Sequence, residues 1–403
     1  MAADSYLYSK YILTCAFALA VSIDGACAKT SFEVLYSFMG GSDGETPDAG
    51  LIMDSSGNLY GTTMYGGNEY GTVFKLAPDG TESVLHAFAP YLDGSNPEAK
   101  LLADKAGNLY GTTSAGGDKG SGTVFKLAPD GSETILYSFC TQQNCADGSD
   151  PVAELIADKH GNFYGTTWTG GSDFASGTVF ELAPDGEEKV LHSFTNENGD
   201  GALPEAGLLA DKAGNLYGTT CYGGEAGFGT VFKLAPDGTE TVLHAFEGTS
   251  DGAYPQATLI ADGSGNFYGT TSEGGATGTG CPKDGCGTIF KLAPDGTETI
   301  LHVFTGAPAD GAKPLGVLIA DKTGNLYGTT EIGGRSFNCY LDCGIVFRIS
   351  SVGKEAILHT FTSGRNGDWP AAGLIRGNGY LYGTTTGQGE YPVGNGNVFK
   401  LEQ

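Results

Sequence analysis

The chain has 403 residues, 67 of them glycine, and a formal net charge of −26. Hydrophobic residues make up 40% and aromatic residues 11% of the chain, which excludes a disordered protein and allows a large core. The strong negative charge argues against nucleic acid and anionic membranes as partners. It leaves cations, basic proteins and neutral polymers such as glycans.

The N-terminus has the pattern of a secretory signal. Lys10 supplies a positive charge, residues 11–23 form an apolar run, and Ala26-Cys27-Ala28 has the small residues of a peptidase site. The run is too short to span a bilayer. We therefore expect residues 1–28 to be a signal peptide, residues 29–403 to be one domain, and no membrane insertion. A lipid anchor on the cysteine of this triplet is the weaker alternative, because the preceding residues lack the aliphatic pattern of such signals.

After the signal, the chain consists of seven copies of one unit. The motif Tyr-Gly-Thr-Thr begins at Tyr60, Tyr110, Tyr164, Tyr217, Tyr268, Tyr327 and Tyr382. A second motif, Gly-x-(Val/Ile)-Phe, begins at Gly71, Gly122, Gly177, Gly229, Gly287, Gly344 and Gly396. Four short runs rich in Val, Ile, Thr, Tyr and Phe, separated by turn residues, fill each unit. This pattern is typical of propeller blades.

The second unit illustrates the expected strands. We place them at residues 100–103, 109–113, 123–127 and 133–139. Their apolar runs are nearly continuous rather than alternating. This indicates sheets that are buried on both faces between neighbouring blades.

The ends of the repeat region predict a closed ring. The seventh unit stops at Val398–Leu401 and lacks a fourth strand, whereas Phe32–Phe38 matches Glu82–Phe88 of the first unit. The N-terminal strand can therefore complete the last blade and remove an open sheet edge. We predict an all-β, seven-bladed β-propeller of four-stranded blades, closed by the N-terminal strand. A stacked solenoid fits less well, because it would need capping units.

These motifs resemble the GloVer-type tandem repeats of bacterial exported proteins and, more distantly, NHL-like propeller repeats. The resemblance covers residues 32–401. It rests on Asn-Leu-Tyr-Gly-Thr-Thr at 108–113, on Gly-Thr-Val-Phe-Lys-Leu at 122–127, and on their equivalents. It implies a propeller fold and export, and it implies no activity.

Cysteine usage also indicates export. Six of the nine cysteines form close pairs that we predict to be disulfides: Cys140/Cys145, Cys281/Cys286 and Cys339/Cys343. Cys221 is left over and is predicted to be a free thiol. Zinc is disfavoured, because each pair lies in a different repeat without two further ligands. The expected location is secreted or extracytoplasmic, in the periplasm or at the cell surface.

Strand order places the loops after the second and fourth strands on one face of the ring, which we call the top face. These loops vary in length, whereas those of the opposite face are short and uniform, so the top face is the predicted binding face. Its candidate binding residues are Tyr65, Tyr70, Trp168, Phe174, Tyr222, Phe228, Arg335, Phe337, Tyr340 and Tyr391. Exposed aromatic rings suit a sugar or a protein partner. The alternative is that several rings fold down and plug their own loops.

Two polar positions recur in the units. An Asp-Gly pair precedes most first strands, at Asp43, Asp93, Asp147, Asp200, Asp251 and Asp310. We predict turns in which the aspartate caps local amides, with calcium as an alternative. A fourth-strand position holds histidine in five units and tyrosine in two, namely His86, His192, His244, His302, His359, Tyr36 and Tyr137. Because the position is distributed around the ring, we predict packing or hydrogen-bonding elements rather than a catalytic base.

Our hypothesis from sequence is an exported, monomeric, non-catalytic binding scaffold whose partner is a glycan or an envelope protein. We predict no catalytic residue, no metal ligand and no cofactor, apart from the calcium alternative. The competing hypothesis is a polysaccharide-active hydrolase or lyase that uses top-face carboxylates. An enzyme of this kind would need an asymmetric acidic cluster near the central channel, confined to two or three blades.

Overall fold

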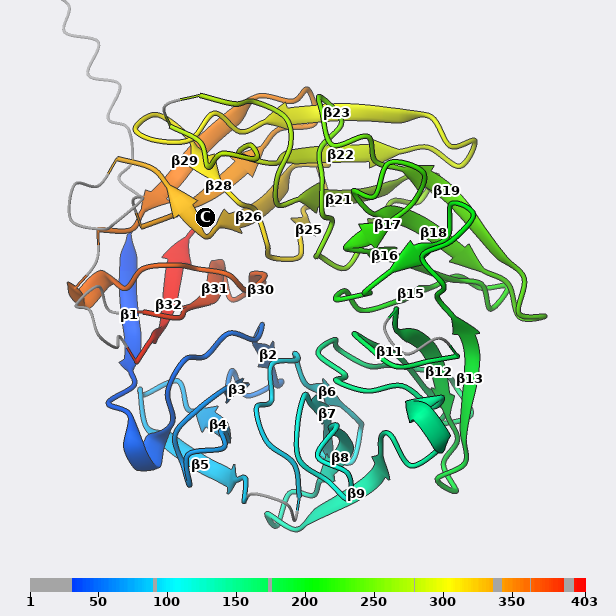
Figure 1. Cartoon of the computed structure of the whole chain (residues 1–403). Coiled ribbons are helices and arrows are strands. Elements are labelled where there is room, and N and C mark those ends of the chain that lie inside the picture. Colours follow the sequence, from blue (N-terminus) through cyan, green and yellow to red (C-terminus); the bar gives the residue numbers. More distant parts are fainter. Residues whose placement is uncertain are drawn as a thin grey trace, which may run out of the picture.

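The computed structural model describes residues 31–89, 93–172, 176–278, 280–335, 343–362, 364–387 and 395–403. They form seven four-stranded antiparallel sheets arranged as a ring around a central axis (Figure 1). The predicted all-β, seven-bladed propeller is confirmed. Across these ranges no helix has the length and apolar character needed to cross a membrane. The predicted signal peptide lies outside the described residues.

In each blade the four strands run from the channel to the outside of the ring (Figure 1). The first strands are β2 (Ile52–Met53), β6 (Leu102–Ala103), β10 (Ile156–Ala157), β15 (Leu209–Ala210), β20 (Ile260–Ala261), β25 (Ile319–Ala320) and β30 (Ile375–Gly377). The second strands are β3 (Leu59–Thr63), β7 (Leu109–Thr113), β11 (Phe163–Thr167), β16 (Leu216–Thr220), β21 (Phe267–Thr271), β26 (Leu326–Thr330) and β31 (Tyr380–Thr385).

The third and fourth strands, which form the outer half of each blade, contain more residues than the first strand. The third strands are β4 (Thr72–Leu76), β8 (Thr123–Leu127), β12 (Thr178–Leu182), β18 (Thr230–Leu234), β22 (Thr288–Leu292), β28 (Ile345–Ile349) and β32 (Asn397–Glu402). The fourth strands are β5 (Glu82–Ala87), β9 (Glu133–Ser138), β13 (Glu188–Ser193), β19 (Glu240–Ala245), β23 (Glu298–Val303), β29 (Glu355–Thr360) and β1 (Phe32–Ser37). We number the blades 1 to 7 in the order of their first strands.

Short elements complete the top face. Two small ribbons pair β14 (Gly201–Ala202) with β17 (Tyr222–Gly223) and β24 (Gly311–Ala312) with β27 (Ile332–Gly333). Isolated bridges such as Glu45 with Tyr65 occupy the same place in other blades. The remaining elements are the 3-10 turns η1 (Gly41–Asp43), η2 (Gln143–Cys145) and η3 (Gly364–Asn366). The segment before each first strand is therefore tied to the loop that follows the second strand.

The ring closes as the sequence predicted. Blade 7 has the strand order β1-β32-β31-β30, and Val34 of β1 lies opposite Phe399 of β32. In the other blades the first residue of the fourth strand is glutamate. Here it is Phe32, whose ring stacks on His359 with 3.8 Å between ring centroids. The N-terminal strand thus supplies both backbone pairing and apolar packing to the last blade.

The Tyr-Gly-Thr-Thr motif is explained by contacts between strands and between blades. A Cβ added to Gly61 would lie 2.8 Å from the Phe74 ring, so this position has no room for a side chain. In blades 1 to 5 the hydroxyl of the second threonine pairs with that of a third-strand threonine, as Thr63 does with Thr72. In six blades the first threonine donates to a carbonyl of the next blade, as Thr384 does to Ala49 across the closure at 3.2 Å, whereas Thr270 Oγ1 in blade 5 has no hydrogen-bond partner.

Phenylalanine pairs fill the interfaces between blades. The phenylalanine that follows each fourth strand meets the third-strand phenylalanine of the next blade edge-to-face, with ring centroids 5.1 to 5.3 Å apart. The pairs are Phe38/Phe74, Phe88/Phe125, Phe139/Phe180, Phe194/Phe232, Phe246/Phe290, Phe304/Phe347 and Phe361/Phe399. All of these rings are buried. This geometry contributes roughly 0.5–1.5 kcal/mol per pair beyond the burial of apolar area.

Candidate functional site

The channel mouth on the top face is lined by backbone in an unusual conformation. In every blade the residue before the proline that recurs in each unit has a positive φ between 55° and 58° although it is not glycine. These seven left-handed residues are Thr46, Asn96, Asp150, Leu203, Tyr254, Lys313 and Trp369. Such a conformation costs roughly 1 kcal/mol or more per residue, and it persists only where surrounding structure enforces it.

Hydrogen bonds on both sides enforce this conformation. The amide of each left-handed residue donates to a carbonyl of the preceding blade at 2.8 to 3.1 Å. Its own carbonyl accepts from the residue that follows Tyr-Gly-Thr-Thr at 2.9 to 3.2 Å. In blade 3, for example, Asp150 donates to Ser121 and accepts from Trp168. The backbone of the mouth is therefore rigid whatever side chain it carries.

The side chains at the mouth differ from blade to blade, in contrast to the repeated framework. The seven left-handed residues are all of different types. The residue after each proline also varies, as Asp48, Glu98, Val152, Glu205, Gln256, Leu315 and Ala371. So does the residue after each Tyr-Gly-Thr-Thr, as Met64, Ser114, Trp168, Cys221, Ser272, Glu331 and Thr386. Since different residue types occur at these positions within one framework, the repeat does not fix their identities, and they can determine what binds.

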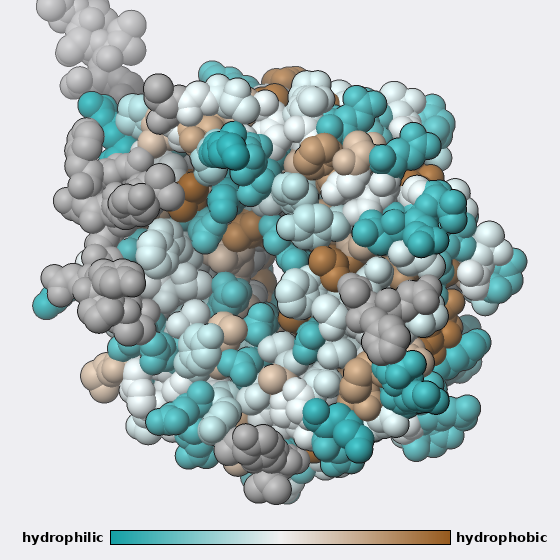
Figure 2. Space-filling view, viewed as in Figure 1, coloured by the Kyte–Doolittle hydropathy of each residue, from teal (hydrophilic) through white to brown (hydrophobic). Residues whose placement is uncertain are grey.

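The residues after the prolines, the short segments that follow them and Trp168 line a cavity of about 450 Å³ on the axis of the ring. Segments from all seven blades line it, and Figure 2 shows a hollow near the centre of the ring. Its wall includes the carboxylates of Asp48, Glu98 and Glu205, the amide of Gln256 and the indole of Trp168. The cavity thus combines polar groups with an aromatic surface, as small-molecule sites do.

Acidic side chains interact across the mouth. Burial raises the pKa of Asp48 to about 6, and the charges of Glu98 and Glu331 add to this rise. Asp48 is half-buried, and the part of its surface that is exposed faces the channel. Burial also raises the pKa values of Glu98 and Glu331, and the positive charge of Lys313 opposes the rise at Glu331. The acidic side chains of the mouth therefore come from several blades, with Asp48 in blade 1, Glu98 in blade 2, Glu205 in blade 4 and Glu331 in blade 6, and the charge of Glu98 also acts on Glu205.

Blades 4 and 5 form the opposite side of the mouth. The amide of Gln256 donates to Glu205, whose pKa is raised by burial. The thiol of Cys221 is buried and free, as the sequence predicted. Burial raises the pKa of this thiol, and the nearby Glu205 and Glu273 add to the rise. This environment disfavours the thiolate, which is the form of cysteine that acts as a nucleophile.

A known family of repeat proteins matches the sequence. The model of the Gloeobacter/Verrucomicrobia repeat matches residues 21–171 and 137–283, more than half of the chain. The chain belongs to this repeat family. The predicted resemblance to GloVer-type repeats is confirmed. No curated protein matches the sequence.

Solved structures were also compared with this chain, and the first of them supports the propeller fold. The extracellular domain of a putative hybrid two-component system from B. thetaiotaomicron has a TM-score of 0.54 at 13% identity, with 92% of this chain and 41% of that chain covered. A putative 6-phosphogluconolactonase from Bacteroides uniformis has a TM-score of 0.49 at 17% identity, with 83% and 87% covered. A luciferin-regenerating enzyme has a TM-score of 0.45 at 13% identity, with 93% and 95% covered. This chain spans less than half of the first structure, and the 13% identity to it supports the fold alone.

The structure separates the predicted aromatic residues of this repeat protein into two groups. Trp168, Tyr65 and Tyr222 are 38%, 41% and 43% exposed on the top face. Tyr70 and Phe228 instead pack against the cores of blade interfaces, so they follow the plug alternative. A Cβ on Gly248 would clash with the Phe228 ring, which shows how closely that ring is held.

The structure describes some of the other predicted site residues and not others. Arg335 is exposed beyond β27. Cys140 is bonded to Cys145 and Cys281 to Cys286, so these two predictions are confirmed. Cys343 is disulfide-bonded, and its predicted partner Cys339 lies outside the described residues, as do Phe174, Phe337, Tyr340 and Tyr391.

Several mouth residues were not predicted. Trp369 is 38% exposed at its left-handed position, and the ring of Tyr254 lies 4.9 Å from that of Tyr222. The inner carboxylates of Asp48, Glu98 and Glu205 were also missed. The sequence did contain a signal for these positions. Each Asp-Gly turn is followed by two residues that differ between units and then by proline. Comparing the units with one another would have separated these variable positions from the invariant framework.

A second ring of polar residues lies at the outer blade interfaces. The Asp-Gly aspartates cap nearby amides as predicted, for example Asp93 with the amide of Ala89 at 2.8 Å. Each aspartate also approaches the fourth-strand histidine or tyrosine. The glutamate that begins the fourth strand of the next blade completes the group. In six interfaces this glutamate keeps a buried oxygen without a hydrogen-bond partner, at Glu82, Glu133, Glu188, Glu240, Glu298 and Glu355.

Replacing Glu82 with glutamine is expected to change how stability depends on pH. Burial raises the pKa of Glu82 to about 7, and the Asp43 charge adds to the rise. The folded state therefore holds the proton of Glu82 more tightly than the unfolded chain does. The protonated carboxyl stabilises the fold at low pH, and this stabilisation is lost as the pH rises from the ordinary carboxyl range through 7. Glu82→Gln should raise the free energy of unfolding by about 1 kcal/mol at pH 8, after allowance for solvent screening, and change it little at pH 4.5.

Urea denaturation at the two pH values measures this difference. Glu402→Gln, at an exposed position, is the matched control and should show no pH-dependent effect. An equal effect of Glu82→Gln at both pH values would show that Glu82 does not titrate differently in the folded protein.

Proposed function

We propose that this protein is an exported, non-catalytic binding scaffold whose channel mouth binds a short neutral segment of a glycan. The observation that carries the proposal is the placement of Trp168. Its indole stands 38% exposed in the wall of the central cavity, among carboxylate and amide side chains. Sugar rings have apolar faces that stack on aromatic side chains and hydroxyl groups that bond to carboxylates and amides.

The dimensions and charge of the site fit this ligand class. A cavity of about 450 Å³ lies within the range of small-ligand sites, and it opens to the top face, where a longer chain could continue. The exposed rings of Tyr222 and Trp369 extend the aromatic surface beyond the cavity. The carboxylates disfavour anionic polymers, so the proposal specifies neutral glycans.

Export is supported by two disulfides. Cys140–Cys145 and Cys281–Cys286 are typical of an oxidising compartment. The N-terminal signal pattern, which lies outside the described residues, agrees with this location. An exported scaffold would meet glycans of the cell envelope or of the surroundings.

Retention on immobilised polysaccharides tests the proposal. The mature protein is passed over a panel of neutral and acidic polysaccharides, and reducing ends are measured in parallel after incubation. We expect retention by at least one neutral polysaccharide without new reducing ends. Retention by none of the neutral polysaccharides would contradict the proposal.

One observation favours a second candidate, a polysaccharide hydrolase or lyase. The carboxyl of Asp48 lies at the channel mouth, where the charges of Glu98 and Glu331 act on it. A carboxyl with a pKa of about 6 can donate a proton near neutral pH while a second carboxylate remains ionised, which is the pairing that glycoside hydrolysis uses. New reducing ends that disappear in Asp48→Asn would establish this candidate instead.

A further inference from the structure

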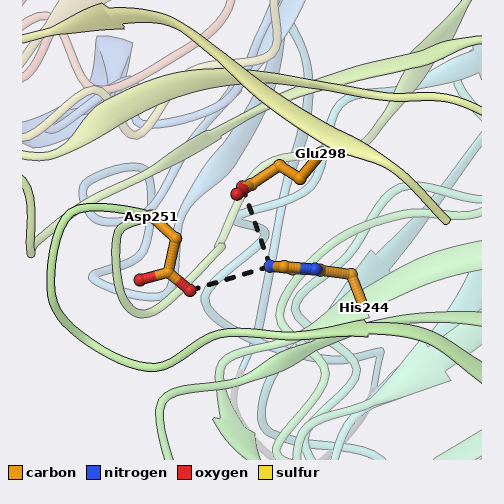
Figure 3. Close-up of side chains that lie close together, drawn as sticks. All are labelled: His244, Asp251 and Glu298. Atoms are coloured by element: carbon orange, nitrogen blue, oxygen red, sulfur yellow. Dashed lines mark ion pairs between the residues drawn. The ribbon is translucent and has the colours of Figure 1, made fainter.

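A cluster of metal-ligating side chains lies far from the axis, at the interface between blades 4 and 5. His244 comes from β19, Asp251 from the Asp-Gly turn after β19, and Glu298 from the start of β23. Figure 3 shows the three side chains pointing toward one another. One ligand atom from each lies within 4.8 Å of the others. Their side chains are only 13 to 19% exposed.

The distances do not correspond to hydrogen bonds. His244 Nε2 lies 3.7 Å from Asp251 Oδ2 and also 3.7 Å from Glu298 Oε1. Both Nε2 and Oε1 are buried without a hydrogen-bond partner. Asp251 is held in place by the amides of Glu247 and Thr249. Ligand atoms around a tetrahedral zinc ion lie about 3.4 Å apart, given bonds of about 2.0–2.1 Å, so the spacing suits a small cation between them.

Equivalent interfaces without this arrangement provide a contrast. Where tyrosine replaces histidine, its hydroxyl donates directly to the aspartate, at 2.9 Å for Tyr36 with Asp43 and 2.8 Å for Tyr137 with Asp147. His86 likewise lies at hydrogen-bond distance from Asp93, at 2.8 Å. Among the described residues, only the clusters at blades 4/5 and 5/6 bring three ligand atoms together.

We propose that His244, Asp251 and Glu298 bind a divalent transition-metal ion of the zinc type. One imidazole and two carboxylates form a ligand set that zinc accepts, and a water molecule would take the fourth position. The ion would neutralise two carboxylates that otherwise face each other across the interface. It would also join β19 of blade 4 to β23 of blade 5 at the outer edge of the ring.

The same ligand set recurs at the next interface. Here His302 Nε2 is hydrogen-bonded to Asp310 Oδ2 at 3.3 Å and lies 3.9 Å from Glu355 Oε1, so an ion would replace this hydrogen bond. Glu355 Oε1 is also buried without a hydrogen-bond partner. The proposal therefore assigns a second ion to blades 5 and 6, so that blade 5 is joined to both of its neighbours.

Zinc itself is the probe. Mature protein without a histidine tag is freed of metal with a chelator, titrated with zinc chloride by calorimetry, desalted and analysed for bound metal. We expect two zinc ions per chain and a rise of about 3 °C in the melting temperature at saturating zinc. No binding at about 100 µM zinc would overturn the proposal.

Substitutions that the fold already accepts assign the ions to their sites. His244→Tyr copies the interfaces of Tyr36 and Tyr137, so the variant should fold, and it should lose one zinc ion. His302→Tyr should lose the other. Glu82→Gln, at a tyrosine interface, is the control and should bind zinc as the unaltered protein does. Metal content that stays unchanged when both histidines are replaced would also overturn the proposal, because the zinc would then lie elsewhere.

Discussion

Removing residues 29–38 from the mature chain is expected to lower the melting temperature by more than about 10 °C or to prevent folding. The deletion exposes the edge of β32 and removes Phe38, which is fully buried against Phe74 of blade 1. It also removes the stack of Phe32 on His359. Each large buried side chain contributes roughly 1.5–3 kcal/mol, so the loss is a large part of the roughly 5–15 kcal/mol that stabilises an ordinary domain.

Thermal unfolding followed by circular dichroism measures this loss. A synthetic peptide of residues 29–40 added to the truncated chain should restore most of the stability, whereas the same peptide with Phe38→Ala should restore much less. A truncated chain that melts within about 2 °C of the full mature chain would mean that the strand is not needed for closure.

Trp168→Ala is expected to weaken retention on the bound glycan about 100-fold. Central aromatic residues of a binding site commonly contribute 2 kcal/mol or more, and roughly 2.7 kcal/mol corresponds to this factor. Val352→Ala is the control, because Val352 is 87% exposed in a turn of the opposite face. Affinity electrophoresis or calorimetry with the retained polysaccharide measures both variants. Equal affinities for Trp168→Ala and Val352→Ala would place the binding surface away from the channel mouth.

The fold could be predicted in detail because its determinants repeat. In the second unit the structure places the last three strands at residues 109–113, 123–127 and 133–138, close to the prediction. The first strand covers only Leu102–Ala103, two residues fewer than predicted. Lys100, where the first strand was predicted to begin, lies instead in the channel wall. Just before it, the left-handed Asn96 and the following proline turn the chain away from the second strand. Such an interruption has no apolar signature in the sequence.

The candidate site was predicted less well, for a different physical reason. The sequence identified the top face and its aromatic residues, but not which rings point outward. Tyr70 and Tyr65 lie in the same loop, yet one packs against the core and the other is exposed. Loop geometry decides between them, and it does not repeat. The outer histidines were predicted as hydrogen-bonding elements, but the glutamate that joins each of them comes from the next blade and was not recognised.

The most direct test of glycan binding at the channel mouth is the fluorescence of Trp168 alone. The chain has only two tryptophans, Trp168 and Trp369, so Trp369→Phe leaves a single reporter in the cavity wall. Titration of this variant with the retained oligosaccharide should shift or quench its emission, with a midpoint equal to the dissociation constant from calorimetry. Saturable binding in the calorimeter without any change in Trp168 emission would contradict a site at the channel mouth.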